Sequence, residues 1–202
     1  MRLLVLTVSS TISPQSHQLP LSGSRWEGVQ KEKVVEERVR VGIVLGSDSD
    51  FQVMQEAVRV LQEFGVGCEV VVASAHRTPQ RAAEYALKAE ERGIEVIIAG
   101  AGMAAHLPGV LASYTCLPVI GVPLQGSALG GVDALYSIVQ MPPGVPVATV
   151  AINGARNAAL LAVQILSLKD PHLRQKFQAY REKLAVSVVE KSKKVQQLLS
   201  NS

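Results

Sequence analysis

From residue 39 to residue 168, short apolar runs alternate with longer segments whose apolar positions recur at helical spacing. The runs predict buried strands and the longer segments predict helices. The expected strands are Val39–Leu45, Cys68–Ala73, Glu95–Ala99, Pro118–Val122 and Pro146–Ala151. The expected helices are Phe51–Phe64, Pro79–Arg92, Ala105–Ser113, Val132–Val139, Asn157–Leu168 and Pro171–Leu199. This alternation predicts an α/β fold, a flavodoxin-like three-layer sandwich with helices on both faces of a parallel sheet, plus a long C-terminal helix.

The chain divides into three parts. Residues 1–38 are expected to be a disordered extension or a targeting segment. The first acidic residue is Glu27, and an acid-poor start with Arg2 and Arg25 is compatible with an organellar transit peptide. Residues 39–169 are expected to form the α/β domain, and residues 170–202 the C-terminal helix.

Composition narrows the class of protein. The chain has 202 residues, of which 48% are hydrophobic, which suits one domain with a substantial core. Much of the net charge of +3 lies in the last helix, so no nucleic-acid partner is indicated. No apolar run reaches the roughly 18 residues of a membrane span, so a soluble protein is expected. Cys68 and Cys116 have no Cys-x-x-Cys spacing and are expected to be buried thiols of a reducing compartment.

Ligands of an open parallel sheet bind beyond the carboxyl ends of its strands, which directs attention to three loops. The first is Gly46-Ser47-Asp48-Ser49-Asp50, which follows a strand and opens a helix. Its hydroxyls and the free N–H groups of the helix suit a phosphate, and either acid could hold a sugar hydroxyl. An ordinary helix cap explains the same residues equally well.

The second loop is Ser74-Ala75-His76-Arg77-Thr78-Pro79. Thr78 and Pro79 suit the start of a helix, which leaves Ser74, His76 and Arg77 near the strand ends. Histidine exchanges protons readily near neutral pH, and arginine binds phosphate or carboxylate with a planar fork. This combination favours a catalytic role for His76 over that of an ordinary surface residue.

The third loop runs from Gly100 to Gly109, and its nearly bare backbone would let a planar ligand approach closely. Gly100, Gly102 and Ala105 formally match a dinucleotide-binding fingerprint. The match follows the third strand and lacks an acid about 20 residues later, so a nicotinamide cofactor is rejected. His106 is interpreted as a structural histidine at the start of a helix, with catalysis as the alternative.

A receiver domain is a non-enzymatic alternative, because Asp48 and Asp50 follow the first strand. Such a domain also needs an acceptor aspartate after the third strand and a lysine after the fifth. Those places hold Gly100–Gly102 and Asn153-Gly154, so this interpretation fails.

Taken in order, several segments resemble one family, the class I N5-carboxyaminoimidazole ribonucleotide mutases of de novo purine synthesis. This is the catalytic-subunit type of phosphoribosylaminoimidazole carboxylase, and the resemblance covers about residues 39–168. Class II relatives carry Lys-Gly where this chain has Arg77-Thr78. Met103 stands where glycine is usual, and 153–156 is shorter than in many members. The matching segments are 46–50, 74–79, 99–102, 104–109, 117–123, 137–142 and 157–162.

The resemblance implies a mutase that moves a carboxylate from the exocyclic nitrogen to carbon 4 of the aminoimidazole ring. It implies that His76 is the general acid/base, that Ser47 and Arg77 lie at the phosphate, that Asp50 lies near the ribose, and that Ser74 lines the pocket.

The resemblance further implies that the Ala101-Gly102 backbone, with Ala104, Ala105 and Leu107, faces the imidazole and the migrating carboxylate. It implies no cofactor and no metal, a homo-octamer in which residues 170–202 pack, and functional pairing with an ATP-dependent synthetase. A cytoplasmic location is expected, or a plastid if residues 1–38 are a transit peptide. Two alternatives stay open: a carboxylase using free carbon dioxide, and a non-catalytic phosphosugar-binding module.

Overall fold

A computed structural model describes residues 38–200, so the extension expected at 1–38 lies outside the described residues apart from Arg38. The sheet has the strand order β2-β1-β3-β4-β5, and its strands pair in parallel. This is the flavodoxin-like order, so the expected fold class is confirmed. The strands are β1 (Val39–Leu45), β2 (Gly67–Val72), β3 (Val96–Gly102), β4 (Val119–Leu124) and β5 (Ala148–Thr149).

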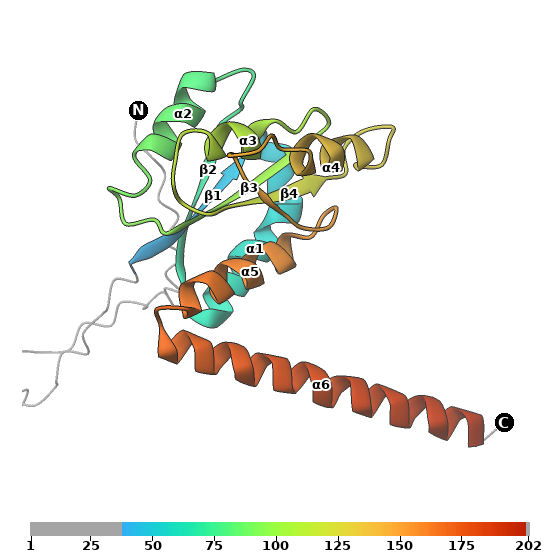
Figure 1. The fold of residues 1–202 in the computed structure, drawn as a ribbon. Helices are drawn as coiled ribbons and strands as arrows, with labels where there is room; N and C mark the ends of the chain where they lie inside the picture. Colours follow the sequence, from blue (N-terminus) through green and yellow to red (C-terminus); the bar gives the residue numbers. More distant parts are fainter. Residues whose placement is uncertain (1–37, 201–202) are drawn as a thin grey trace, which may run out of the picture.

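Helices cover both faces of this sheet, giving three layers (Figure 1). One core cluster joins α1 and α5 to inward side chains such as Val41 and Ile98, and a second joins α2, α3 and α4 to Val44 and Ile97. Ile97 and Ile98 face opposite layers because side chains alternate along a strand. The helices are α1 (Phe51–Phe64), α2 (Pro79–Leu87), α3 (Leu107–Ala112), α4 (Val132–Val139), α5 (Ala155–Ser167) and α6 (Pro171–Ser200), with a 3-10 turn, η1 (Asp48–Asp50).

Three expectations need correction. The helix expected over Pro79–Arg92 ends at Leu87, because the next residues form turns that lead to Gly93, which has φ +87°. The strand expected over Pro146–Ala151 is only Ala148–Thr149, with a two-residue ladder to β4. Cys116 is exposed and Cys68 is half-buried, so the expectation of a buried thiol was wrong for Cys116 and met only in part for Cys68. No helix among residues 38–200 is long and apolar enough to cross a membrane.

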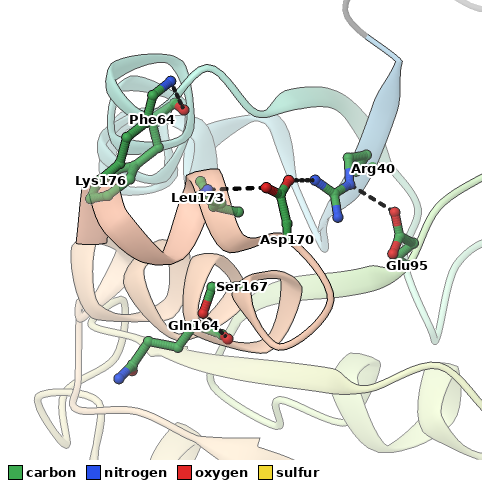
Figure 2. Close-up of polar contacts among 8 residues, drawn as sticks. All are labelled: Arg40, Phe64, Glu95, Gln164, Ser167, Asp170, Leu173 and Lys176. Atoms are coloured by element: carbon green, nitrogen blue, oxygen red, sulfur yellow. Dashed lines mark hydrogen bonds and ion pairs between the residues drawn. The ribbon is translucent and has the colours of Figure 1, made fainter. Parts of the chain in front are cut away.

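The start of α6 is fixed to the domain by a polar cluster around Asp170 (Figure 2). Asp170 Oδ1 accepts the N–H of Leu173 at 3.0 Å, which caps the helix, and Pro171 follows at its first position. Asp170 Oδ2 pairs with Arg40 at 3.0 Å, and Arg40 Nε donates to Glu95 at 2.7 Å. Lys176 Nζ donates to the carbonyl of Phe64 at 3.1 Å. These contacts join α6 to β1, α1 and the start of β3.

An Asp170→Ala variant is expected to lose about 1 kcal/mol of unfolding free energy, because a side-chain cap is removed. Asp170→Asn is the matched variant, since it retains an acceptor for the Leu173 N–H and loses only the charge that pairs with Arg40. Urea unfolding should rank the wild type above Asp170→Asn, and Asp170→Asn above Asp170→Ala. Equal stability of Asp170→Ala and the wild type would contradict the capping role.

The same cluster predicts a pH effect. The bond from Leu173, with a smaller contribution from Arg40, lowers the pKa of the Asp170 carboxyl below its usual range. A carboxyl whose pKa is lower in the folded chain adds stability above its ordinary pKa and loses it as pH falls through the lowered value. The stability difference between wild type and Asp170→Asn should therefore shrink as the solution is acidified.

Candidate active site

Three loops at the carboxyl ends of β1, β2 and β3 surround a cleft of 630 Å³. The strand order reverses between β1 and β3, which is where ligands of this fold bind. The lining residues are Gly46, Ser47, Ser49, Asp50, Ser74, Ala75, His76, Arg77, Ala101, Gly102, Met103, Ala104, His106, Leu107 and Gly126. This edge of the sheet therefore brings together the three loops that the sequence singled out.

The loop after β1 is built around Ser47. Its backbone N–H donates to Asp50 Oδ2 at 2.8 Å, and its carbonyl accepts the Asp50 N–H at 3.3 Å. The Ser47 hydroxyl donates to Asp48 Oδ1 and accepts from Ser49 Oγ. Burial raises the pKa of the Asp50 carboxyl, against the opposing effect of N–H groups of Ser47 and Gly46. Asp50 is thus fixed in position and half-buried at the cleft wall.

The loop after β2 is closed by its own side chains. Thr78 Oγ1 accepts the Ser74 N–H at 2.9 Å and donates to the Ser74 carbonyl at 3.1 Å. Ser74 Oγ accepts the Arg77 N–H at 3.2 Å. The Arg77 guanidinium then reaches across the cleft and donates to the Gly46 carbonyl at 3.1 Å. The Arg77 side chain therefore links two of the three loops that line the cleft.

His76 contacts a second histidine, His106. His76 Nε2 and His106 Nδ1 are 2.9 Å apart, and the rings meet edge to face with centroids 5.0 Å apart. A hydrogen bond at this distance requires that one nitrogen carries the proton and the other accepts it. Both side chains are exposed to solvent in the cleft. The pair can therefore hold and transfer a single proton at the cleft surface.

The loop after β3 supplies backbone more than side chains. Gly100 has no room for a side chain, since an added Cβ would lie 2.8 Å from Met54 Sδ. Met103 adopts φ +56°, in the left-handed region that favours glycine. This explains why glycine suits the position, and places the Met103 side chain, 61% exposed, at the cleft rim.

The expected site residues gather here with one exception. Ala105 is 1% exposed and packs in the core beneath the cleft, so its methyl group does not line the cleft. His106 was interpreted as structural, yet it precedes α3 without capping it and contacts His76. In the sequence, the imidazole of His106 was the one sign of a functional role. Its contact with His76 became visible only in the structure, where the parallel pairing of β1 with β2 and β3 brings the two loops together. The expected residues that line the cleft are Ser47, Asp50, Ser74, His76, Arg77, Ala101, Gly102, Ala104 and Leu107.

Comparison with known proteins decides the family. The family description "AIR carboxylase" matches residues 40–187, most of the described chain. The chain belongs to the AIR carboxylase family. Its fold is similar to that of a solved protein, since the crystal structure of Treponema denticola PurE superposes with a TM-score of 0.70. That structure is 29% identical and the match covers 78% of this chain and 98% of that one.

Other relatives have a higher sequence identity to this chain than the Treponema denticola protein has. A protein of Pyrococcus horikoshii named N5-carboxyaminoimidazole ribonucleotide mutase is 60% identical over 80% of this chain and 92% of its own length. The phosphoribosylaminoimidazole carboxylase of Saccharomyces cerevisiae is 57% identical over 77% of this chain and 27% of its own length. The family resemblance seen in the motifs is thus confirmed across nearly the whole α/β part of the chain.

Proposed function

We propose that this chain is an isomerase of purine biosynthesis that converts N5-carboxyaminoimidazole ribonucleotide to 4-carboxy-5-aminoimidazole ribonucleotide. The observation that carries the proposal is 56–66% identity to relatives named as this mutase. The cleft supports it, because hydroxyls, a guanidinium, a carboxyl and an imidazole pair meet at one strand edge. Residues 39–169 would be the catalytic domain.

The charged end of the substrate would lie at the loops after β1 and β2. Ser47 and Arg77 would hold the phosphate, because a guanidinium and a hydroxyl donate to phosphate oxygens. Asp50 would accept a ribose hydroxyl, and Ser74 would line the pocket between them. The backbone of Ala101 and Gly102 would lie against the imidazole ring. Ala104 and Leu107 would border the migrating carboxylate, with Ala105 supporting that wall from the core.

His76 would move the protons of the reaction. A proton given to the carbamate nitrogen makes that nitrogen a good leaving group, so its bond to the carboxyl carbon breaks and carbon dioxide departs. Carbon 4 of the ring then attacks the carbon dioxide held in the cleft, and loss of the carbon 4 proton to His76 restores aromaticity. One imidazole can thus give the first proton and take the last, so no cofactor is required.

Two effects supply the rate. General acid–base catalysis contributes about 100- to 10,000-fold. Holding ring and carbon dioxide together contributes about 7–11 kcal/mol, because a bimolecular step becomes effectively unimolecular.

Arg77→Met is expected to raise KM about tenfold or more while kcat changes less, because a charge-assisted bond to phosphate contributes about 1.5–3 kcal/mol. Arg77→Lys is the matched variant: it keeps the charge but loses the fork that also reaches Gly46. Steady-state kinetics of both variants would check this. A normal KM for Arg77→Met would remove Arg77 from the phosphate site.

The activity is tested by mixing the pure protein with 4-carboxy-5-aminoimidazole ribonucleotide, without ATP or added bicarbonate. Loss of the product's ultraviolet absorbance towards an equilibrium mixture is expected. Unchanged absorbance would reject the mutase.

A carboxylase that adds free carbon dioxide to aminoimidazole ribonucleotide is the second candidate, favoured by the name of the yeast relative. Incorporation of labelled bicarbonate with aminoimidazole ribonucleotide as sole substrate would identify it. A non-catalytic phosphosugar-binding module would bind the ribonucleotide and show neither reaction, and His76 would then be dispensable.

The protein is proposed to act as a homo-octamer. The outer face of α4 supports assembly, since Val132, Tyr136 and Val139 share one helical side and are 43–61% exposed, with Leu129 just before them. The preceding loop contributes Gly126 to the cleft, so a neighbouring copy on this face would lie beside the site.

Tyr136→Glu is expected to reduce the mass measured by sedimentation from that of eight chains to that of smaller species. An unchanged mass would exclude this face as an interface.

The reaction would follow an ATP-dependent synthetase that supplies the carbamate, and the yeast relative, of which this chain covers 27%, has length for additional parts. Adding the purified synthetase to this protein with aminoimidazole ribonucleotide, ATP and bicarbonate should produce the carboxylated product.

The location of the protein would be cytoplasmic, or plastidic if residues 1–38 direct import.

A further inference from the structure

Helix α6 continues far beyond the domain that anchors it (Figure 1). Its first part packs on the core: Leu173 is buried, and Phe177 and Tyr180 contact Phe64 with ring centroids 6.1 and 5.6 Å away. From residue 181 to residue 200, nearly every residue is exposed. This exposed part is therefore longer than a typical whole helix, which has about 11–12 residues.

The exposed part still carries apolar residues at regular spacing. Leu184, Val188, Val195 and Leu198 are 49%, 65%, 57% and 69% exposed. They continue the helical side that Leu173, Phe177 and Tyr180 use against the core, because residues three, four and seven apart share a side. Together with Lys191 we call this set the α6 seam: Leu184, Val188, Lys191, Val195 and Leu198.

The α6 seam has the spacing of a coiled coil. Its steps of four, three, four and three residues place valines at a positions, Val188 and Val195, and leucines at d positions, Leu184 and Leu198. In parallel coiled coils, valine at a with leucine at d favours two strands. Lys191 occupies the central d position, where the two ammonium groups of a parallel pair would face each other and lower its stability.

The residues beside the seam are compatible with a second identical helix. The flanking e and g positions hold Ala185, Ser187 and Ser192, which are small and uncharged. Lys194 at g would meet Leu199 at e of the other strand, so no pair of like charges is opposed there. Two copies can thus approach along the seam without repulsion at its edges.

We propose that residues 184–199 of α6 pair with the same residues of a second copy as a parallel two-stranded coiled coil. Most of this segment lies beyond residue 187, where the match to the family description ends. Two heptads are weak on their own, but a segment tethered to an assembled domain pairs at a high effective concentration. The proposal does not depend on the mutase activity.

The test places a cysteine on the seam and another beside it in the full chain. Exposed Cys116 is first replaced (Cys116→Ser) so that it cannot cross-link. Val188→Cys puts two thiols opposite each other at disulfide range in a parallel pair. Val189→Cys is the matched control, since Val189 is 55% exposed and lies off the seam. Mild oxidation should shift most of the Val188→Cys chain, but little of the control, to twice the monomer mass on a non-reducing gel.

A monomer band alone for Val188→Cys, or the same fraction of dimer for both variants, would overturn the proposal. The segment would then bind a partner other than a second copy of itself. Lys191→Leu gives a second measurement that needs no cysteine. Removing two facing ammonium groups from the seam should raise the temperature at which the helical circular dichroism of the distal segment is lost. An unchanged or lower temperature would count against pairing along this seam.

Discussion

A His76→Asn variant is expected to lose about 100- to 10,000-fold in turnover, the range that general acid–base catalysis supplies. Asparagine keeps a polar group of similar size, but its amide cannot give a proton to the carbamate nitrogen or take one from carbon 4. In the proposed site the phosphate and the ribose would be held by other residues, Ser47, Asp50 and Arg77. Substrate should therefore still bind, with a dissociation constant close to that of the wild type.

The matched control is His172→Asn. His172 is exposed near the start of α6 and belongs to another part of the molecule, so its substitution should leave turnover unchanged. Turnover is measured by the absorbance change, and binding by calorimetry with the inactive variant. Near-normal turnover of His76→Asn would remove His76 from the proton transfers, and loss of binding as well would assign it to the substrate contacts.

A Gly42→Ala variant is expected to be destabilised by about 1–3 kcal/mol, the usual cost of overpacking a core. Gly42 lies in β1 between β2 and β3, and an added Cβ would collide with the Tyr85 hydroxyl. It would also lie 3.1 Å from Tyr85 Cζ and 3.3 Å from Ile94 Cδ1. The gain from a stiffer unfolded chain is only about 0.4–1 kcal/mol, so the collision decides the sign.

Tyr85→Phe should restore part of that loss. The Tyr85 hydroxyl is buried, and among the described residues it has no hydrogen-bond partner. Burial, with a smaller effect of the Glu69 carboxylate, raises the pKa of Tyr85, so the group is a neutral phenol. Removing an unpaired buried hydroxyl costs little, and it clears the atom nearest to the new Cβ.

Chemical denaturation of the wild type, the two single variants and the double variant gives the free energy of interaction between positions 42 and 85. Gly126→Ala is the control, because an added Cβ there meets nothing within 4 Å. Additive effects of Gly42→Ala and Tyr85→Phe would mean that the collision with the hydroxyl is not the cause of the loss.

The pattern of apolar residues along the chain was sufficient to predict several elements. Val39–Leu45, Phe51–Phe64 and Val132–Val139 are found at the expected bounds. In α1 the buried residues follow the helical period of 3.6, and β1 ends in five consecutive buried residues, as expected of a strand covered on both faces, so both patterns can be recognised from the local sequence. The sequence also identified the three loops of the cleft, because parallel strands place their carboxyl ends at one edge.

Only the tertiary structure decided the remainder. The helix from Pro79 ends at Leu87 because the chain must turn at Gly93 to enter β3, and β5 is short because only two of its residues pair with β4. His106 meets His76 although 30 residues separate them, since the registers of β1 with β2 and with β3 bring their loops together. A local pattern reports which side of an element is buried, but the partner that covers it is fixed by contacts between distant segments.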